Sequence, residues 1–199
     1  EATGFILNAI EPNTIEECVE KVESEIGHID TLVFNLGAQT GIKRLSETSN
    51  KAFEFSWRLA TFSLFRAAAV VLPLMERRSK GNFLVTSATA ALRGNAGQTA
   101  HASAMAGRRK LCESINAEYA AKGVHIAHIL IDGLVDAPDT LGKIMGEKSF
   151  KKLRESRGMK HDGLVLPAKV AETYLHLANQ HRSTWTYELD IRSFNDIAW

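Results

Sequence analysis

One histidine of this sequence is the strongest candidate for side-chain chemistry. His101 lies in the stretch GQTAHASAMAGRRKL, Gly97 to Leu111, and an imidazole can transfer protons near pH 7. Met105 lies one helical turn further along the same face, and Ser87 follows an apolar run that could bring its hydroxyl nearby. The alternative is that His101 is a polar side chain filling the mouth of a cleft, because no orienting carboxylate accompanies it.

Polar and small residues follow three predicted strands and are candidate ligand contacts. The strands are continuous apolar runs, as expected when both faces of a parallel sheet are covered. They span Thr31–Phe34, Asn82–Thr86 and His125–Ile131, and after them come Asn35 with Gly37, Ser87 with Thr89, and Asp132 with Gly133. In open α/β sheets ligands bind beyond the carboxyl ends of the strands, so we expect these residues near a ligand. Each residue alone is equally compatible with ordinary turn or cap chemistry.

Helical patterns alternate with these strands along the chain. They predict helices at Asn13–Ile26 (with Asn13 and Glu16 as a capping pair), Asn50–Arg78, Thr99–Ala121 and Pro167–Asn179. The second helix contains Pro73, which predicts that the helix is kinked or broken near it. Further strands are predicted at Phe5–Leu7 and Thr186–Ile191, and 139–165 forms a Lys-rich insertion. The alternation implies right-handed crossovers, hence an α/β fold with helices on both sides of a parallel sheet, in a single domain over residues 1–199.

Composition and charge exclude several classes of partner. The 45% hydrophobic fraction is ordinary for a core-forming globular protein, and a net charge of +1 gives no electrostatic reason to expect nucleic acid or an anionic membrane. The longest apolar run, Ala67–Leu74, is far shorter than the roughly 18 residues of a membrane span. Cys18 and Cys112 lie far apart on apolar helix faces, so we expect no disulfide and a reducing, cytoplasmic setting.

Four segments together resemble the short-chain dehydrogenase/reductase family, in an atypical bacterial subgroup. They are Gly27–Gly37 (GHIDTLVFNLG), Gly81–Ala88, Gly97–Lys110 and Val124–Ala137. The resemblance implies a Rossmann-like, doubly wound parallel sheet that binds NAD or NADP and interconverts carbonyls and alcohols. It also implies that Asn8, Asn35, Gly37, Asp132 and Gly133 occupy cofactor-binding positions.

The residues that perform the family's chemistry are replaced. The tyrosine position holds His101, the lysine position Met105, the serine position Ala88 and the asparagine position Ala60. A tyrosine needs a nearby cation to work at neutral pH, and Met105 supplies none. Lys110 lies on the opposite helix face, and Arg108 shares the face of His101 but lies about 10 Å further along the axis.

The start of the chain also departs from the family. The glycine-rich turn that cradles phosphate would precede Glu1, so we expect an N-terminally truncated sheet and a sequence that is a piece of a longer one. The predicted strand Phe5–Leu7 would then lack its neighbour in the family's sheet order.

Two functions remain open. One is an NAD(P)-dependent oxidoreductase with unusual chemistry led by His101, helped by Ser87; the other is a non-catalytic scaffold or ligand-binding protein of the same fold. We expect the 199-residue chain to show no nicotinamide-linked turnover. We also expect a homodimer, or a tetramer, through Asn50–Met75 and Thr99–Tyr119, because four phenylalanines enrich the long helix in aromatic surface: Phe53, Phe55, Phe62 and Phe65.

Overall fold

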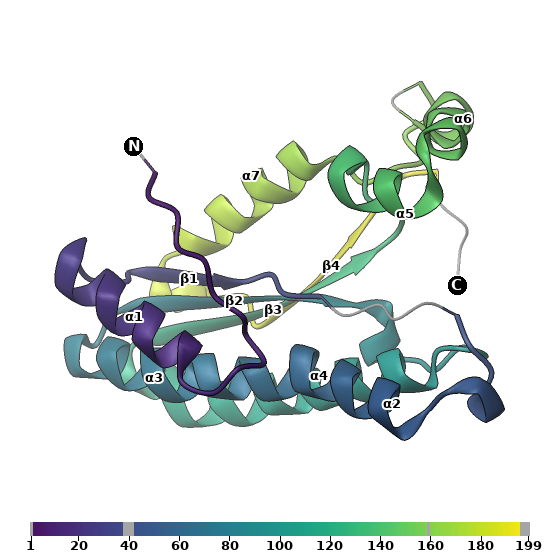
Figure 1. Ribbon diagram of the computed structural model, residues 1–199. Helices are drawn as coiled ribbons and strands as arrows, with labels where there is room; N and C mark the ends of the chain where they lie inside the picture. Colours follow the sequence, from purple (N-terminus) through teal and green to yellow (C-terminus); the bar gives the residue numbers. More distant parts are fainter. Residues whose placement is uncertain (1, 38–41, 159, 196–199) are drawn as a thin grey trace. The chain divides into compact units, whose positions relative to one another are not determined.

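A four-stranded parallel sheet organises the chain (Figure 1), with strand order β1-β2-β3-β4. The strands are β1 Thr31–Phe34, β2 Gly81–Ala88, β3 Val124–Asp132 and β4 Glu188–Arg192. β1 and β2 pair in register from Thr31 opposite Asn82 to Phe34 opposite Val85. The first seven residues of β3 are all buried, which explains its uninterrupted apolar pattern. The four strands predicted downstream of residue 30 are confirmed, with small shifts of their ends.

The computed structural model describes residues 2–37, 42–158 and 160–195. Two compact units are distinguished, one formed by 1–130 with 181–189 and the other by 131–180 with 190–199. The helices of the first unit are α1 Thr14–Glu25, α2 Asn50–Trp57, α3 Ser63–Arg78 and α4 Thr99–Tyr119. Those of the second are α5 Lys143–Met145, α6 Glu147–Arg157 and α7 Pro167–Ala178. Short 3-10 turns lie at Leu45–Glu47, Thr89–Ala91, Ala120–Lys122 and Arg182–Thr184, and π turns at Arg58–Phe62 and Pro138–Gly142.

The core of the first unit lies between its helices and the sheet. Val71, Leu72 and Met75 of α3 pack with Phe83 of β2 and Ile126 of β3, and all five are buried. Figure 1 shows α1, α3 and α4 running alongside the strands of this unit. The helix Asn50–Arg78 is long and apolar enough to cross a bilayer by length and composition, but 56% of its most apolar window is buried within the protein. Burial of this kind is what the core helix of a layered α/β fold requires.

The strand predicted at Phe5–Leu7 is wrong. Residues 2–8 form no regular structure, and the Ile6 side chain is fully exposed. A strand needs a neighbour for its backbone hydrogen bonds, and in the described residues the sheet ends at β1, with nothing beyond it for Phe5–Leu7 to join. The segment instead passes near α1, where the ammonium of Lys21 lies 5.3 Å from the Phe5 ring centroid.

The long helix is not broken at Pro73, one of the two outcomes predicted there. Pro73 lies inside α3, and the irregular turn is the π turn Arg58–Phe62. Proline removes only one backbone N–H from the ladder, whereas a π turn redirects carbonyls away from their usual partners. One of these, the Ala60 carbonyl, accepts hydrogen bonds from Nε and Nη2 of Arg108 at 2.9 and 2.7 Å.

The predicted capping pair at α1 does not form. Asn13 precedes the helix as expected, but its φ of 65° leaves its side chain without a capping hydrogen bond. Glu16 instead accepts a hydrogen bond from Nε of Arg66 at 3.0 Å. Arg66 is nearly buried and also donates to the carbonyls of Ala9 and Glu11 at 3.1 and 2.8 Å. The Arg66 guanidinium lowers the pKa of Glu16, so this ion pair ties α1 to α3.

Arg108 is the largest fully buried side chain among the described residues of the first unit, with 1% of its surface exposed. Besides Ala60 it donates to the carbonyl of Thr86 at 2.6 Å and to that of Leu36 at 2.7 Å. Its guanidinium also lies 5.2 Å from the Phe34 ring centroid. One side chain of α4 therefore joins the ends of β1 and β2 to the π turn.

We expect Arg108→Met to destabilise the first unit strongly. Leaving buried carbonyls without donors costs about 1–3 kcal/mol each, so the loss should exceed about 3 kcal/mol in urea unfolding. Arg108→Lys should recover only part of it, because an ammonium cannot span three carbonyls in a plane. The exposed Lys110→Met is the control and should change stability by less than about 0.5 kcal/mol. Equal effects of the Arg108 and Lys110 variants would contradict this role.

A buried histidine makes the stability of the fold depend on pH. His128 of β3 is 0% exposed, and its Nδ1 lies 3.0 Å from Oε2 of Glu188, which accepts hydrogen bonds from Arg109 at 2.7 and 3.0 Å. Burial lowers the pKa of His128 below its usual 6.5, although Glu188 opposes this. In the unfolded chain His128 therefore takes up a proton near pH 6.5, whereas in the folded chain it does so only at lower pH. The free energy of unfolding therefore falls as pH drops below this value.

We expect His128→Gln to flatten the dependence of stability on pH between about 6.5 and 5. Glutamine keeps a polar group beside Glu188 but cannot take up the proton. Urea unfolding of both proteins across this range measures the difference. Parallel pH curves for wild type and variant would show that His128 contributes nothing.

Candidate functional site

Three positions aligned with the family's catalytic residues pack against one another. Ala60 comes from the π turn, Ala88 ends β2 and Met105 lies on α4. Ala60 and Met105 are buried, and they form one apolar cluster with Ala88 at its border. The other members are Ala90, Ala91, Ala104 and Leu130, with Leu59 and Ala102 packed against them. The fold thus assembles the expected place of catalysis but fills it with aliphatic groups and a thioether.

Ser87 lies at this cluster, beside Met105. Its hydroxyl is buried and lies 3.9 Å from the sulfur of Met105. A thioether is a weak acceptor and not a base, so this contact does not activate the hydroxyl as a nucleophile or proton donor.

His101 is half-buried near the start of α4. Its position follows the helical spacing: His101, Met105 and Arg108 lie at i, i+4 and i+7, so they share one face of α4. The role of His101 as proton donor stays a prediction.

The spacing of residues along α4 did not predict the structural role of Arg108. Its Cα lies about two turns beyond His101, yet its side chain leans back along α4 and reaches Ala60 and Thr86. Four hydrogen bonds from its guanidinium go to the backbone carbonyls of Leu36, Ala60 and Thr86, so Arg108 holds these segments together at the site. The available signal was an arginine on the same helix face as the buried Ala104, Met105 and Cys112.

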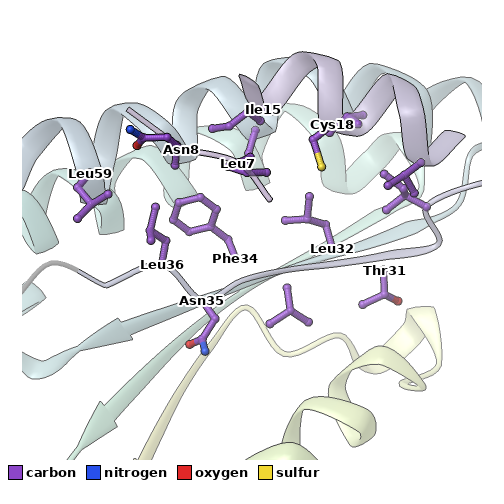
Figure 2. A pocket seen from close by; sticks show the side chains of 16 residues that line it. Leu7, Asn8, Ile15, Cys18, Thr31, Leu32, Phe34, Asn35, Leu36 and Leu59 are labelled. Carbon is purple, nitrogen blue, oxygen red and sulfur yellow. The ribbon is translucent and has the colours of Figure 1, made fainter. Parts of the chain in front are cut away.

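A cavity of about 640 Å³ lies between α1, the N-terminal segment and β1. Figure 2 shows Phe34 and Leu36 directed toward α1, with the Cys18 sulfur facing Leu32 across the opening. Most of its lining is apolar; the polar side chains are Asn8, Thr31 and Asn35, besides the Cys18 thiol. The cavity thus brings together Asn8 and Asn35, two of the predicted cofactor contacts.

These two asparagines differ in their hydrogen bonds and in the direction of their side chains. Asn8 is engaged in its own turn, accepting from the Ile10 N–H at 3.3 Å and donating to Glu11 at 3.4 Å. Asn35 points to the opposite side of the chain from Phe34, as alternation along a strand requires (Figure 2). Asn35 is therefore the stronger candidate for contact with a ligand.

The other predicted cofactor positions contribute less. A side chain at Gly37 would meet nothing within 4 Å, so no close contact requires glycine there. Asp132 and Gly133 belong to the second unit. There the Asp132 carboxylate lies 3.5 Å from Arg192, and Gly133 has a φ of 143°, which favours glycine.

The described cavity does not fit a whole nicotinamide dinucleotide. The pyrophosphate of such a cofactor needs backbone N–H groups, a helix N-terminus or cations. Among the described residues that line the cavity none is lysine, arginine or histidine, and the first turn of α1 carries Glu16 and Glu17. The lining suits a planar or aliphatic group and disfavours a doubly charged one.

Comparison with known proteins identifies relatives of this chain. It is 27% identical over 137 residues to a 3-oxoacyl-(acyl-carrier-protein) reductase, FabG, of Escherichia coli, covering 69% of this chain and 55% of the relative. The chain thus spans about half the length of the curated relatives it matches.

Solved structures share the fold. A short-chain dehydrogenase from Rhodopseudomonas palustris superposes with a TM-score of 0.74 at 26% identity, covering 94% of this chain and 73% of that one. An NADPH-bound short-chain oxidoreductase from Pseudomonas aeruginosa, described as containing an atypical catalytic center, gives 0.78 at 23% identity, covering 94% and 73%. The model of the short chain dehydrogenase family matches residues 1–141, and the chain therefore belongs to that family.

Proposed function

We propose that this chain descends from NAD(P)-dependent oxidoreductases acting on carbonyl/alcohol pairs and keeps their fold without their acid/base chemistry. The observation that carries the proposal is the apolar cluster of Ala60, Ala88 and Met105. Proton transfer requires a donor within hydrogen-bond reach of the substrate and a neighbour that tunes its pKa. Met105 cannot tune a pKa by charge, and the nearby cation Arg108 is committed to carbonyls.

The family supports the oxidoreductase ancestry. The Escherichia coli relative is named as a reductase, and the Pseudomonas aeruginosa structure combines bound NADPH with an atypical catalytic center. An unusual set of residues is thus compatible with this fold, and His101 with Ser87 is the set that this chain would use.

The second candidate function is binding of a small apolar molecule without turnover. The cavity beside β1 is within the size range of ligand sites and is mainly aliphatic. We also propose a cytoplasmic location, since both cysteines are free and burial raises the pKa of the Cys112 thiol to about 12.

We expect the 199-residue chain to bind NADH and NADPH weakly and to oxidise neither with a panel of 3-oxoacyl thioesters and simple ketones. Loss of a positioned acid/base alone costs about 10²–10⁴ in rate. Cofactor fluorescence titration measures binding, and absorbance at the nicotinamide band measures turnover. Turnover that disappears in His101→Ala would make His101 the proton donor and overturn the proposal. Turnover unchanged in that variant would place the catalytic group elsewhere, and would equally overturn it.

We propose that α2, α3 and α4 form a homodimer interface. Five large aromatic side chains of the long helix are partly exposed: Phe53, Phe55, Trp57, Phe62 and Phe65. Trp57, Phe62 and Phe65 stack in a row with ring centroids 5.6 and 6.1 Å apart. A contiguous exposed aromatic row is typical of a surface that another protein covers.

We expect wild type to have about twice the 21.9 kDa mass of the chain by light scattering at micromolar concentration, or four times if the dimer doubles. Phe65→Glu should shift it to the monomer, because burying a carboxylate in an apolar interface is unfavourable. Leu175→Glu, at an exposed apolar residue of α7, is the control and should leave the mass unchanged. A monomeric wild type would rule out this interface.

A further inference from the structure

The second unit concentrates positive charge on one short stretch. From Lys143 to Arg157 there are six lysines and arginines and two glutamates, a net charge of +4. The whole chain carries only +1, so its other residues together carry −3. Nearly all the basic excess of the protein therefore lies on α5 and α6.

Three lysines of α6 form no ion pair with the residues that the structure describes. Lys148, Lys151 and Lys152 are exposed, and in the ranges that the structure describes they form no ion pair. They lie at spacings of three and four residues, so their ammonium groups share adjoining positions on the helix surface. Like charges at these spacings destabilise an isolated helix by a few tenths of a kcal/mol. An anionic partner would remove this repulsion.

α6 is nevertheless held firmly by its opposite side. Phe150 is buried and packs where a side chain at Gly142 would approach it to 3.2 Å. Arg154 pairs with Asp136 at 3.1 Å, which joins α6 to the segment after β3. The helix thus presents its lysines on a fixed surface, and preorganised charges bind at a lower entropic cost than mobile ones.

A groove runs beside this surface. A cavity of about 820 Å³ is lined by α6 and by the segments on either side of it. Three basic residues line it, Lys151, Arg154 and Lys160, together with three acidic ones, Asp136, Glu147 and Glu155, so the wall of the groove carries both charges. Ile144 of α5, 82% exposed, adds an apolar contact one turn before α6.

We propose that the α6 surface, defined by Lys148, Lys151, Lys152 and Lys160, docks an acidic segment of another protein. Carboxylates would lie against the lysines, and an aliphatic or aromatic side chain of the partner would contact Ile144. Complementary charge speeds encounter and sets specificity, and the apolar contact adds burial.

Two other polyanions fit the surface less well. A membrane-binding helix needs an apolar face to insert, and the exposed side chains of α6 are all polar. Single-stranded nucleic acid needs exposed aromatic rings for base stacking, and the one aromatic ring of α6, Phe150, is buried. The net negative charge of the rest of the chain further disfavours a long polyanion.

The test is fluorescence anisotropy of the full chain with a fluorescein-labelled polyglutamate peptide of about eight residues, extended to about 26 Å. This exceeds the length of the eleven-residue α6, about 16 Å. We expect binding that weakens steeply with salt, because exposed charges are screened. Lys148→Glu with Lys151→Glu and Lys152→Glu should weaken it about tenfold or more.

The matched control places the same change of charge elsewhere. Lys21→Glu with Lys51→Glu and Lys80→Glu alters three exposed lysines of the first unit and should weaken binding by less than about threefold. Circular dichroism of both triple variants checks that they fold. Equal weakening by the two variants would overturn the proposal, as would no binding of the peptide by wild type. Tighter binding of phosphatidylserine vesicles or of an oligothymidine strand would also overturn it, in favour of a membrane or nucleic-acid partner.

Discussion

The first unit depends on a cation that is buried without solvent around it. Removing a guanidinium from water costs several kcal/mol, and Arg108 recovers this only because carbonyls of Leu36, Ala60 and Thr86 converge on it. Those carbonyls come from the ends of two strands and from a π turn. The ends of β1 and β2 and the π turn must therefore keep their relative positions, or the charge is left unpaired. The irregular helix is thus a requirement of the core.

The same constraint explains why the vacated site is apolar. With the guanidinium held by carbonyls, a second cation at position 105 would lie close to the first and would be repelled by it in a medium of low dielectric constant. Met105 fills the space without charge, and Ala60 and Ala88 leave no polar atom that would need a partner. An asparagine at position 60 or a lysine at position 105 would place a polar group where the present side chain is buried. Catalytic residues that act as a unit contribute non-additively, so restoring one of them alone would not restore the activity of the set.

Sequence pattern predicted what depends on local periodicity and missed what depends on partners. The buried run of β3 and the amphipathic α4 were found because each carries its own apolar pattern. Phe5–Leu7 carries the same pattern, but a strand exists only where a neighbour accepts its hydrogen bonds. The π turn and the reach of Arg108 are tertiary properties, since both are stabilised by carbonyls distant in sequence. The cavity beside β1 likewise arises from packing that no single segment encodes.

Partly buried charges are paired within the chain, whereas the exposed lysines of α6 are not paired among the described residues. In the first unit the partly buried cations are matched internally: Arg66 with Glu16, Arg78 with Glu23 and Arg109 with Glu188. Burial alone would raise the pKa of Glu23, but hydrogen bonds from the Ile29 N–H, His28 and Arg78 lower it to about 2. Such matched charges cannot change singly without leaving a partner unpaired. The exposed lysines of α6 have no such partners among the described residues, so they are free to change without cost to the fold. Their number and spacing are therefore better explained by something that binds them than by the stability of the chain.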